Sequence, residues 1–393
     1  MLSSGKKKKT VVGLDVEAGS VAATEVTENG SIGITRFGTV GLGSGVFREG
    51  EVSDPDALGQ AFKELFAQKK LSKTVRLGIA SQRVAVRTIP IPVIEDQKEL
   101  DTAIRFQAQD HIPMPLDQAV LDWQVVGRSM SDNGEATLNV VVVAARRESL
   151  HGLITAMRQA GLRPVGIDLS AFAMIRALAG KTHAAVGTSS YVDAPGASAE
   201  QQRIAGHLAG DGSAGQASSS EDDEAERSDE VVRLYCNLGD VTNLAVARGR
   251  ACLFTRVSPF GIEGIAQKLA ERRRLNLEHA RQWLVHVGLE TPAESVEGDP
   301  ELVSAARESL AEGAIRLVDE LRLSLNYYGA QEGALPVEGV VACGPGTTIP
   351  GLTERLQREL GQRFEVARPQ ALAHLDDPTA ARLTVSLGLG MEQ

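Results

Sequence analysis

Long hydrophobic runs are absent from this chain. No apolar stretch approaches the roughly 18 to 20 residues that cross a bilayer, and the first residues lack the apolar segment of a signal peptide. Cysteine is scarce as well, because Cys236, Cys252 and Cys343 are an odd number at no metal-ligand spacing. These absences argue against a membrane-spanning helix, a disulfide framework and a zinc module, and we expect buried thiols in a reducing cytoplasm.

Basic residues are too few to suggest a nucleic-acid partner. The net charge is −10, only 4% of the residues are aromatic, and no basic stripe interleaved with aromatic residues occurs. The acidity is concentrated in residues 181–230, which hold ten acidic residues against three basic ones and almost no large apolar side chain. Such a segment cannot bury enough surface to offset its ordering entropy, so the sequence predicts a disordered acidic linker there.

A strand that runs into a small polar turn appears twice, in residues 11–21 and 234–244, and a glycine-rich turn follows a third strand at 339–346. Small residues allow backbone N–H groups to approach an anion closely. Two such hairpins that face each other across a cleft hold a phosphate chain in actin-like nucleotide clamps. The pattern predicts cofactor-binding positions at Asp15, Gly19, Ser20, Asn237, Gly239, Asp240, Thr242, Asn243, Gly344 and Gly346.

Among these residues, Asp15 is also placed to hold Mg²⁺ through water. The metal prediction therefore rests on this one carboxylate and on the phosphates that it would accompany.

The order of predicted elements favours an α/β protein with an actin-like (ribonuclease H-like) duplicated fold and an inserted small α+β subdomain. Asp54 and Pro55 open a helix with a buried face, two prolines at 90 and 92 are expected to end a strand that begins at 84, and residues 383–387 read as a final strand. The predicted parts are a basic tail (1–9), a first actin-like subdomain (10–89 plus 166–180), an inserted SHS2-like subdomain (90–165), the linker (181–230), a second actin-like subdomain (231–260 plus 335–393) and a helical subdomain (261–334).

The segment Ile112-Pro113-Met114-Pro115-Leu116-Asp117, which follows an amphipathic helix, resembles the PilM family of actin-like type IV pilus assembly proteins. Further segments are similar to that family at 99–111, 121–126, 140–148, 161–169, 253–256 and 320–328. The resemblance to the cell-division protein FtsA is more distant.

What the resemblance to PilM implies is a scaffold that binds ATP and Mg. It would bind the cytoplasmic tail of a PilN-like protein in a groove between the inserted and first subdomains, and reach a PilO-like protein indirectly. Its location would be cytoplasmic, peripheral at the inner face of the membrane, and self-association is possible.

This chain departs from the family at its clamp. Glu17 stands where PilM-like chains have glycine, Ala22 replaces a lysine, Asn237 replaces an aspartate, and Pro345 interrupts consecutive glycines. Arg281 and Leu284 stand where a glutamate and a lysine are expected near the adenosine. Loss of the ammonium and of one adenosine contact costs about 3–5 kcal/mol, which turns a micromolar site into a roughly millimolar one.

The sequence therefore predicts a degenerate ATP site, and it leaves enzymatic activity uncertain, with a non-enzyme favoured. Two alternatives stay open: an FtsA-like protein that forms filaments, and an actin-superfold sugar kinase.

Overall fold

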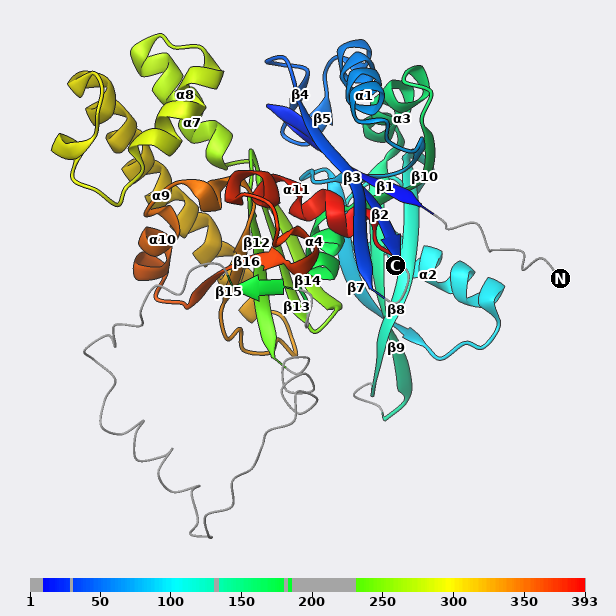
Figure 1. Ribbon diagram of the computed structural model, residues 1–393. Helices are drawn as coiled ribbons and strands as arrows, with labels where there is room; N and C mark the ends of the chain where they lie inside the picture. The colour runs from blue at the N-terminus through cyan, green and yellow to red at the C-terminus, as the bar shows by residue number, and fades with distance from the viewer. Residues whose placement is uncertain (1–9, 29–30, 131–133, 180–182, 186–230, 393) are drawn as a thin grey trace, which may run out of the picture.

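The computed structural model describes residues 10–28, 31–130, 134–179, 183–185 and 231–392 (Figure 1). The predicted basic tail (1–9) and most of the predicted linker (181–230) lie outside the described residues. Two β-sheets, one from each half of the chain, dominate the molecule, and a third, smaller sheet belongs to the inserted segment. The chain is thus duplicated in architecture, as the paired hairpins predict.

The first half forms a five-stranded sheet in the order β10-β6-β1-β2-β3. β1 is antiparallel to β2 and parallel to β6. Helices α1 and α3 share one hydrophobic cluster with this sheet. The bounds are β1 Val11–Glu17, β2 Ser20–Glu28, β3 Ile32–Gly41, β4 Phe47–Arg48, β5 Glu51–Val52, α1 Pro55–Lys69, β6 Thr74–Ile79, α3 Arg147–Gln159 and β10 Arg163–Leu169.

Helix α1 begins where the sequence predicts it. The side chain of Asp54 accepts hydrogen bonds from the backbone N–H groups of Asp56 and Ala57, and Pro55 occupies the first turn. Lys70 ends the helix in the left-handed conformation, with φ 52°. The face that carries Leu58 and Phe62 is buried, which fixes the helix against the sheet.

The second half forms a six-stranded sheet in the order β11-β16-β15-β12-β13-β14. One face of this sheet packs on four helices that share a single apolar cluster. The bounds are β11 His183–Ala185, β12 Val232–Leu238, β13 Thr242–Arg248, β14 Ala251–Ser258, α7 Ile262–Arg273, α8 Leu277–Val287, η3 Ala293–Ser295, α9 Pro300–Gly329, β15 Val340–Cys343, η4 Pro345–Thr348, α10 Leu352–Leu360, β16 Phe364–Pro369 and η5 Gln370–Leu372.

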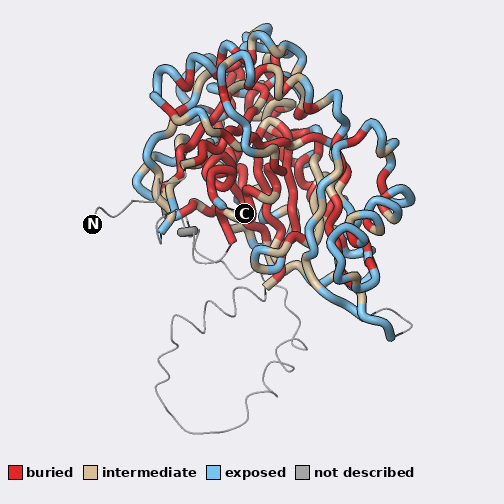
Figure 2. Tube along the Cα trace, turned by 90° about the vertical axis from the view of Figure 1, so that its right-hand side faces the viewer, coloured by how far each residue is buried: buried red, intermediate tan, exposed pale blue. Residues whose placement is uncertain are grey.

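Two helices, α4 (Ser170–Leu178) and α11 (Asp377–Gly390), lie between the sheets of the two halves (Figure 1). α4 packs on the second sheet, and α11 contributes to an apolar cluster with β2 of the first sheet. The helices cross closely at Gly388, where an added Cβ would lie 1.9 Å from the backbone oxygen of Ala173. Figure 2 shows that the buried residues gather in the interior of the molecule.

The inserted segment forms a three-stranded sheet in the order β7-β9-β8, with helix α2 on one face. Its elements are β7 Val84–Pro92, α2 Gln97–His111, η1 Leu116–Gln118, β8 Ala119–Met130 and β9 Ala136–Arg146. The buried side chains of α3 pack with α1 and the first sheet, outside the apolar cluster of this module. The division into subdomains stays a prediction. The packing of α3 favours an inserted part that ends before this helix.

Three local predictions were wrong. β7 continues through Pro90 to Pro92, because it is an edge strand and a proline there need not donate to a second neighbour. Residues 383–387 belong to helix α11 and not to a strand. Their apolar character on all sides reflects burial between the two halves, which hides the helical period.

The third correction concerns residues 183–185 of the predicted linker. They form strand β11, which pairs with β16 at the edge of the second sheet.

The three cysteines are free and buried, as predicted. Burial raises the pKa of Cys236 and of Cys252 to about 12, so these thiols stay protonated at neutral pH.

Candidate functional site

The two polar hairpins meet at their tips. The backbone N–H of Ala18, in the turn between β1 and β2, donates to Oδ2 of Asp240 at 2.5 Å. Oδ1 of Asp240 accepts from the backbone N–H of Val241 at 2.9 Å, which holds the carboxylate in place. The amide that would approach a phosphate in an open clamp is therefore bonded to a carboxylate of the opposite hairpin.

Two arginines close the sides of the first hairpin. Arg382, from α11, donates to Ser20 Oγ and forms an ion pair with Glu17 at 3.3 Å. Arg281, from α8, pairs with Glu263 at 2.7 Å. Its guanidinium carbon would lie 2.6 Å from a Cβ added at Gly19, so this arginine covers the glycine of the turn.

Three carboxylates gather inside this closed clamp. Burial raises the pKa of Asp15 to about 7, and the negative charge of Asp240 adds to the effect. Burial likewise raises the pKa of Glu17 to about 7, although Arg382 opposes it. The pKa of Asp240 rises to about 7 through burial and the charge of Glu17, against the two backbone hydrogen bonds that it accepts.

In this arrangement a nucleoside triphosphate would have to displace contacts that the chain makes with itself. Its phosphates would enter a buried site that holds three carboxyl groups, and they would be repelled by any of these groups that is ionised. Glu17 also comes within 2.4 Å of a Cβ added at Gly239, so its side chain crosses toward the second hairpin.

The carboxyl of Asp15 is buried and accepts a hydrogen bond from Ser170 Oγ at 3.4 Å. Within the described residues, no group of three His, Cys, Asp or Glu side chains is placed to hold a metal ion.

The other residues predicted from the sequence serve different contacts. Thr242 Oγ1 donates to the backbone oxygen of Phe260 at 2.8 Å and is fully buried. Gly346 packs where a Cβ would approach Leu238 at 2.7 Å. A Cβ added at Gly344, which has φ 89°, would lie 1.9 Å from Oδ1 of Asn237, so those two positions stay at the clamp.

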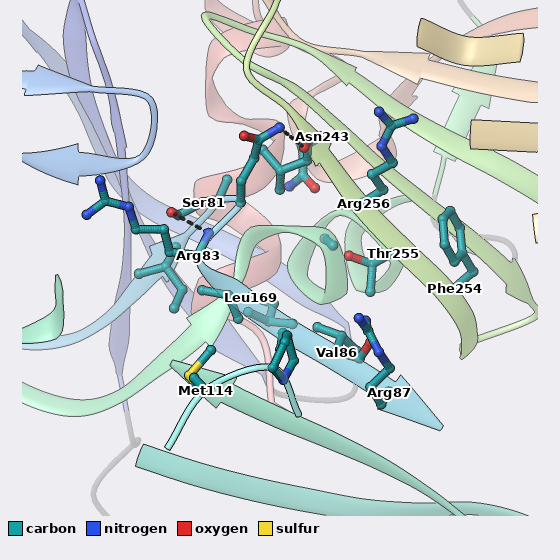
Figure 3. A pocket seen from close by; sticks show the side chains of 18 of the residues that line it. Ser81, Arg83, Val86, Arg87, Met114, Leu169, Asn243, Phe254, Thr255 and Arg256 are labelled. Atoms are coloured by element: carbon teal, nitrogen blue, oxygen red, sulfur yellow. Dashed lines mark hydrogen bonds between the residues drawn. The ribbon is translucent and has the colours of Figure 1, made fainter. Parts of the chain in front are cut away.

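A groove of about 960 Å³ lies elsewhere on the molecule, between the two halves and the inserted module (Figure 3). Its walls come from the end of β6 and the start of β7, from Pro113 and Met114, and from β14 and the end of α9. Four arginines line the groove, and none of the described residues that line it is acidic: the arginines are Arg83, Arg87, Arg146 and Arg256. The resemblance implies a partner groove between the inserted and first subdomains, with no residues named, whereas this groove is also lined by the second half. Pro113 and Met114, which line it, belong to the motif on which the resemblance rests most.

Asn243 lines the same groove and lies on β13, across from the segment that carries Ser81 (Figure 3). It is 1% exposed, and neither its side-chain oxygen nor its nitrogen has a hydrogen-bond partner among the described residues. A buried side-chain amide without partners is uncommon in folded proteins and calls for an explanation.

The fold and its paired hairpins define an actin-like protein. A solved structure titled "PilM-PilN type IV pilus biogenesis complex" is 24% identical to this chain, covers 98% of both chains and superimposes with a TM-score of 0.71. The family model described as "Type IV pilus assembly protein PilM" matches residues 13–187. The chain is similar to that family over these residues, and the resemblance seen in the sequence is confirmed.

Two further solved structures are more remote. The ethanolamine utilization protein EutJ from Carboxydothermus hydrogenoformans is 14% identical, covers 98% of this chain and 90% of its own, and has a TM-score of 0.47. MreB5 of Spiroplasma citri bound to ADP is 11% identical, covers 97% of this chain and 94% of its own, and has a TM-score of 0.48. Within the described residues, no helix is long and apolar enough to cross a membrane.

Proposed function

We propose that the protein is a scaffold of a type IV pilus or related secretion complex, which binds the cytoplasmic tail of a PilN-like membrane protein in the groove beside the inserted module. The observation that carries the proposal is that Pro113 and Met114, from the segment most similar to PilM, line a groove of about 960 Å³. The solved complex of PilM with PilN supports this choice of partner. Attachment through that tail would hold the scaffold at the inner face of the membrane, and a PilO-like protein would join through the partner.

The groove suits a short peptide better than a small metabolite. Residues of two strands line it, with apolar side chains such as Val86, Leu169 and Phe254 among its arginines (Figure 3). A mixed lining of this kind lets a peptide bury alternate side chains while its main chain stays hydrogen-bonded.

The proposed scaffold works without ATP turnover. The clamp closes through Asp240, Arg281 and Arg382, so the two halves are joined by the chain's own side chains. A sugar kinase would need this cleft for its nucleotide, and the crowding by carboxylates argues against that alternative. FtsA-like filament formation has no specific support among the described contacts.

The test is a calorimetric titration of the full chain with a synthetic peptide of the partner's N-terminal cytoplasmic tail. Met114→Asp places a charge in the groove and is expected to weaken binding at least about tenfold, because burying an apolar side chain is worth about 1.5–3 kcal/mol. Met130→Asp is the matched control, since Met130 lies in the same module, is 68% exposed and is outside the groove. Absence of peptide binding to the unmodified chain, or equal loss in both variants, would overturn the proposal.

A further inference from the structure

Two edge strands border the groove. β7 is the outer strand of the module sheet, and β14 is the outer strand of the second-half sheet. Each contributes a consecutive run to the groove lining, residues 84–87 and residues 254–257. Figure 3 shows side chains from both runs on the walls of the groove, so the two halves of the protein supply opposite sides of one site.

An edge strand presents backbone N–H and C=O groups that its own sheet does not pair. β7 pairs only with β9, and β14 pairs only with β13, within the described part of the chain. The segment just before β7 touches the end of β14, where Gln82 Nε2 donates to the backbone oxygen of Val257 at 3.2 Å. Both strands line the groove beside that contact, so an extended segment bound there could pair through its main chain with an unpaired strand edge.

Asn243 supplies the second, independent observation. Its side-chain amide offers an acceptor oxygen and two N–H donors, so it can pair with both the N–H and the C=O of a peptide group. Neither the oxygen nor the nitrogen has a hydrogen-bond partner in the described structure. Asn237, which pairs with Asn243 across β12 and β13, differs because the Sγ of Cys343 lies 3.9 Å from its Oδ1. Of these two neighbouring amides on one face of the sheet, the one that lines the groove is therefore the one without a partner.

We infer that the bound tail lies as an extended strand between β7 and β14, and that the amide of Asn243 hydrogen-bonds to its main chain. This inference rests on the proposed function, because it takes the tail as the occupant. It adds that the second half of the chain takes part in recognition. The tail then links β7 to β14, so its affinity depends on the relative orientation of the two halves of the protein.

Asn243→Leu separates a recognition role from a structural one. The substitution removes a buried amide that has no partner, so the unfolding midpoint of the free protein is expected to stay the same or to rise. The affinity for the tail peptide is expected to fall about tenfold or more, because the main chain of the peptide loses its partner in a buried site. Asn326→Leu, at an exposed asparagine of the same half outside the groove, is the control and should bind like the unmodified chain.

Hydrogen exchange on the unmodified chain gives a second readout that does not depend on a variant. Peptide addition should slow exchange in residues 84–87 and also in residues 254–257. A peptide that binds, loses affinity in Met114→Asp, and yet protects only residues 84–87 would overturn this inference while leaving the proposed function intact. An Asn243→Leu variant with a lower midpoint and unchanged affinity would overturn it as well, because the amide would then hold the fold and not the tail.

Discussion

The clamp should make the protein less stable as the pH rises through neutrality, and Glu17→Gln tests this. Burial raises the pKa of Glu17 from 4.5 to about 7. Between these values the folded chain keeps a proton that the unfolded chain has released. The free energy of unfolding therefore falls as pH rises from about 4.5 to 7, and the full penalty applies above pH 7.

The size of the effect follows from the shift. A difference of about 2.5 pKa units corresponds to about 3 kcal/mol at 1.36 kcal/mol per unit, which is an upper value for a side chain that is 14% exposed. Glutamine keeps the shape of the side chain without its charge. We expect Glu17→Gln to be more stable than the unmodified protein by up to about 3 kcal/mol at pH 8, and equally stable at pH 4.5 or below. Since the charge of Glu17 also raises the pKa of Asp240, part of the change will come from that neighbour.

The assay is urea unfolding at half-unit steps from pH 4.5 to 8.5, with the difference between variant and parent taken at each pH so that the titration of other groups cancels. Glu332→Gln removes an exposed carboxylate far from the clamp in sequence and should give a flat difference. A Glu17→Gln variant that is less stable than its parent at pH 8, or whose difference does not change with pH, would refute the reasoning. The first result would mean that the ion pair with Arg382 outweighs the cost of burying the charge.

Two further predictions concern the clamp and the crossing helices. Calorimetric titration with Mg-ATP should give a dissociation constant of about 1 mM or weaker, because the phosphates would have to displace Asp240 and Arg281 and enter beside buried carboxyl groups. Micromolar binding would show that the clamp opens readily and would contradict this prediction. Gly388→Ala should destabilise the fold by about 3 kcal/mol or more, since the new Cβ meets the backbone of α4. The control variant Gly329→Ala, with open space around the new Cβ, should be neutral or slightly stabilising. Similar thermal unfolding midpoints for the two variants would contradict the close packing where α4 and α11 cross.

Local patterns in the sequence were sufficient to predict most of the elements. Asp54 with Pro55 marks the start of α1, and the spacing of apolar residues gives its buried face. α11 was misread because a helix buried on all sides shows no polar face, so a short apolar window resembles a strand. The proline argument at β7 failed for a different reason, since only the arrangement of strands shows that β7 has an open edge.

The site was harder to predict than the fold. Departures at Glu17 and Arg281 could be recognised in the sequence, but their contacts with Arg382 and Gly19 join segments more than 200 residues apart. The groove combines short stretches from β7, from the loop after α2 and from β14, none of which is unusual by itself. Asn243 was assigned to the cofactor because it belongs to the second hairpin, and only the three-dimensional structure shows that it lines the groove.

The clamp and the groove share one structural part, the hairpin of β12 and β13. Asp240 in its turn bonds to the first hairpin, and Asn243, three residues later, lines the groove. A change in the angle between the halves must therefore move both contacts together, because a short antiparallel hairpin cannot bend independently at each of them. Asp240, Arg281 and Arg382 tie the two hairpins together. Under the proposed function, a tail that changed the angle between the halves on binding would therefore have to work against these contacts.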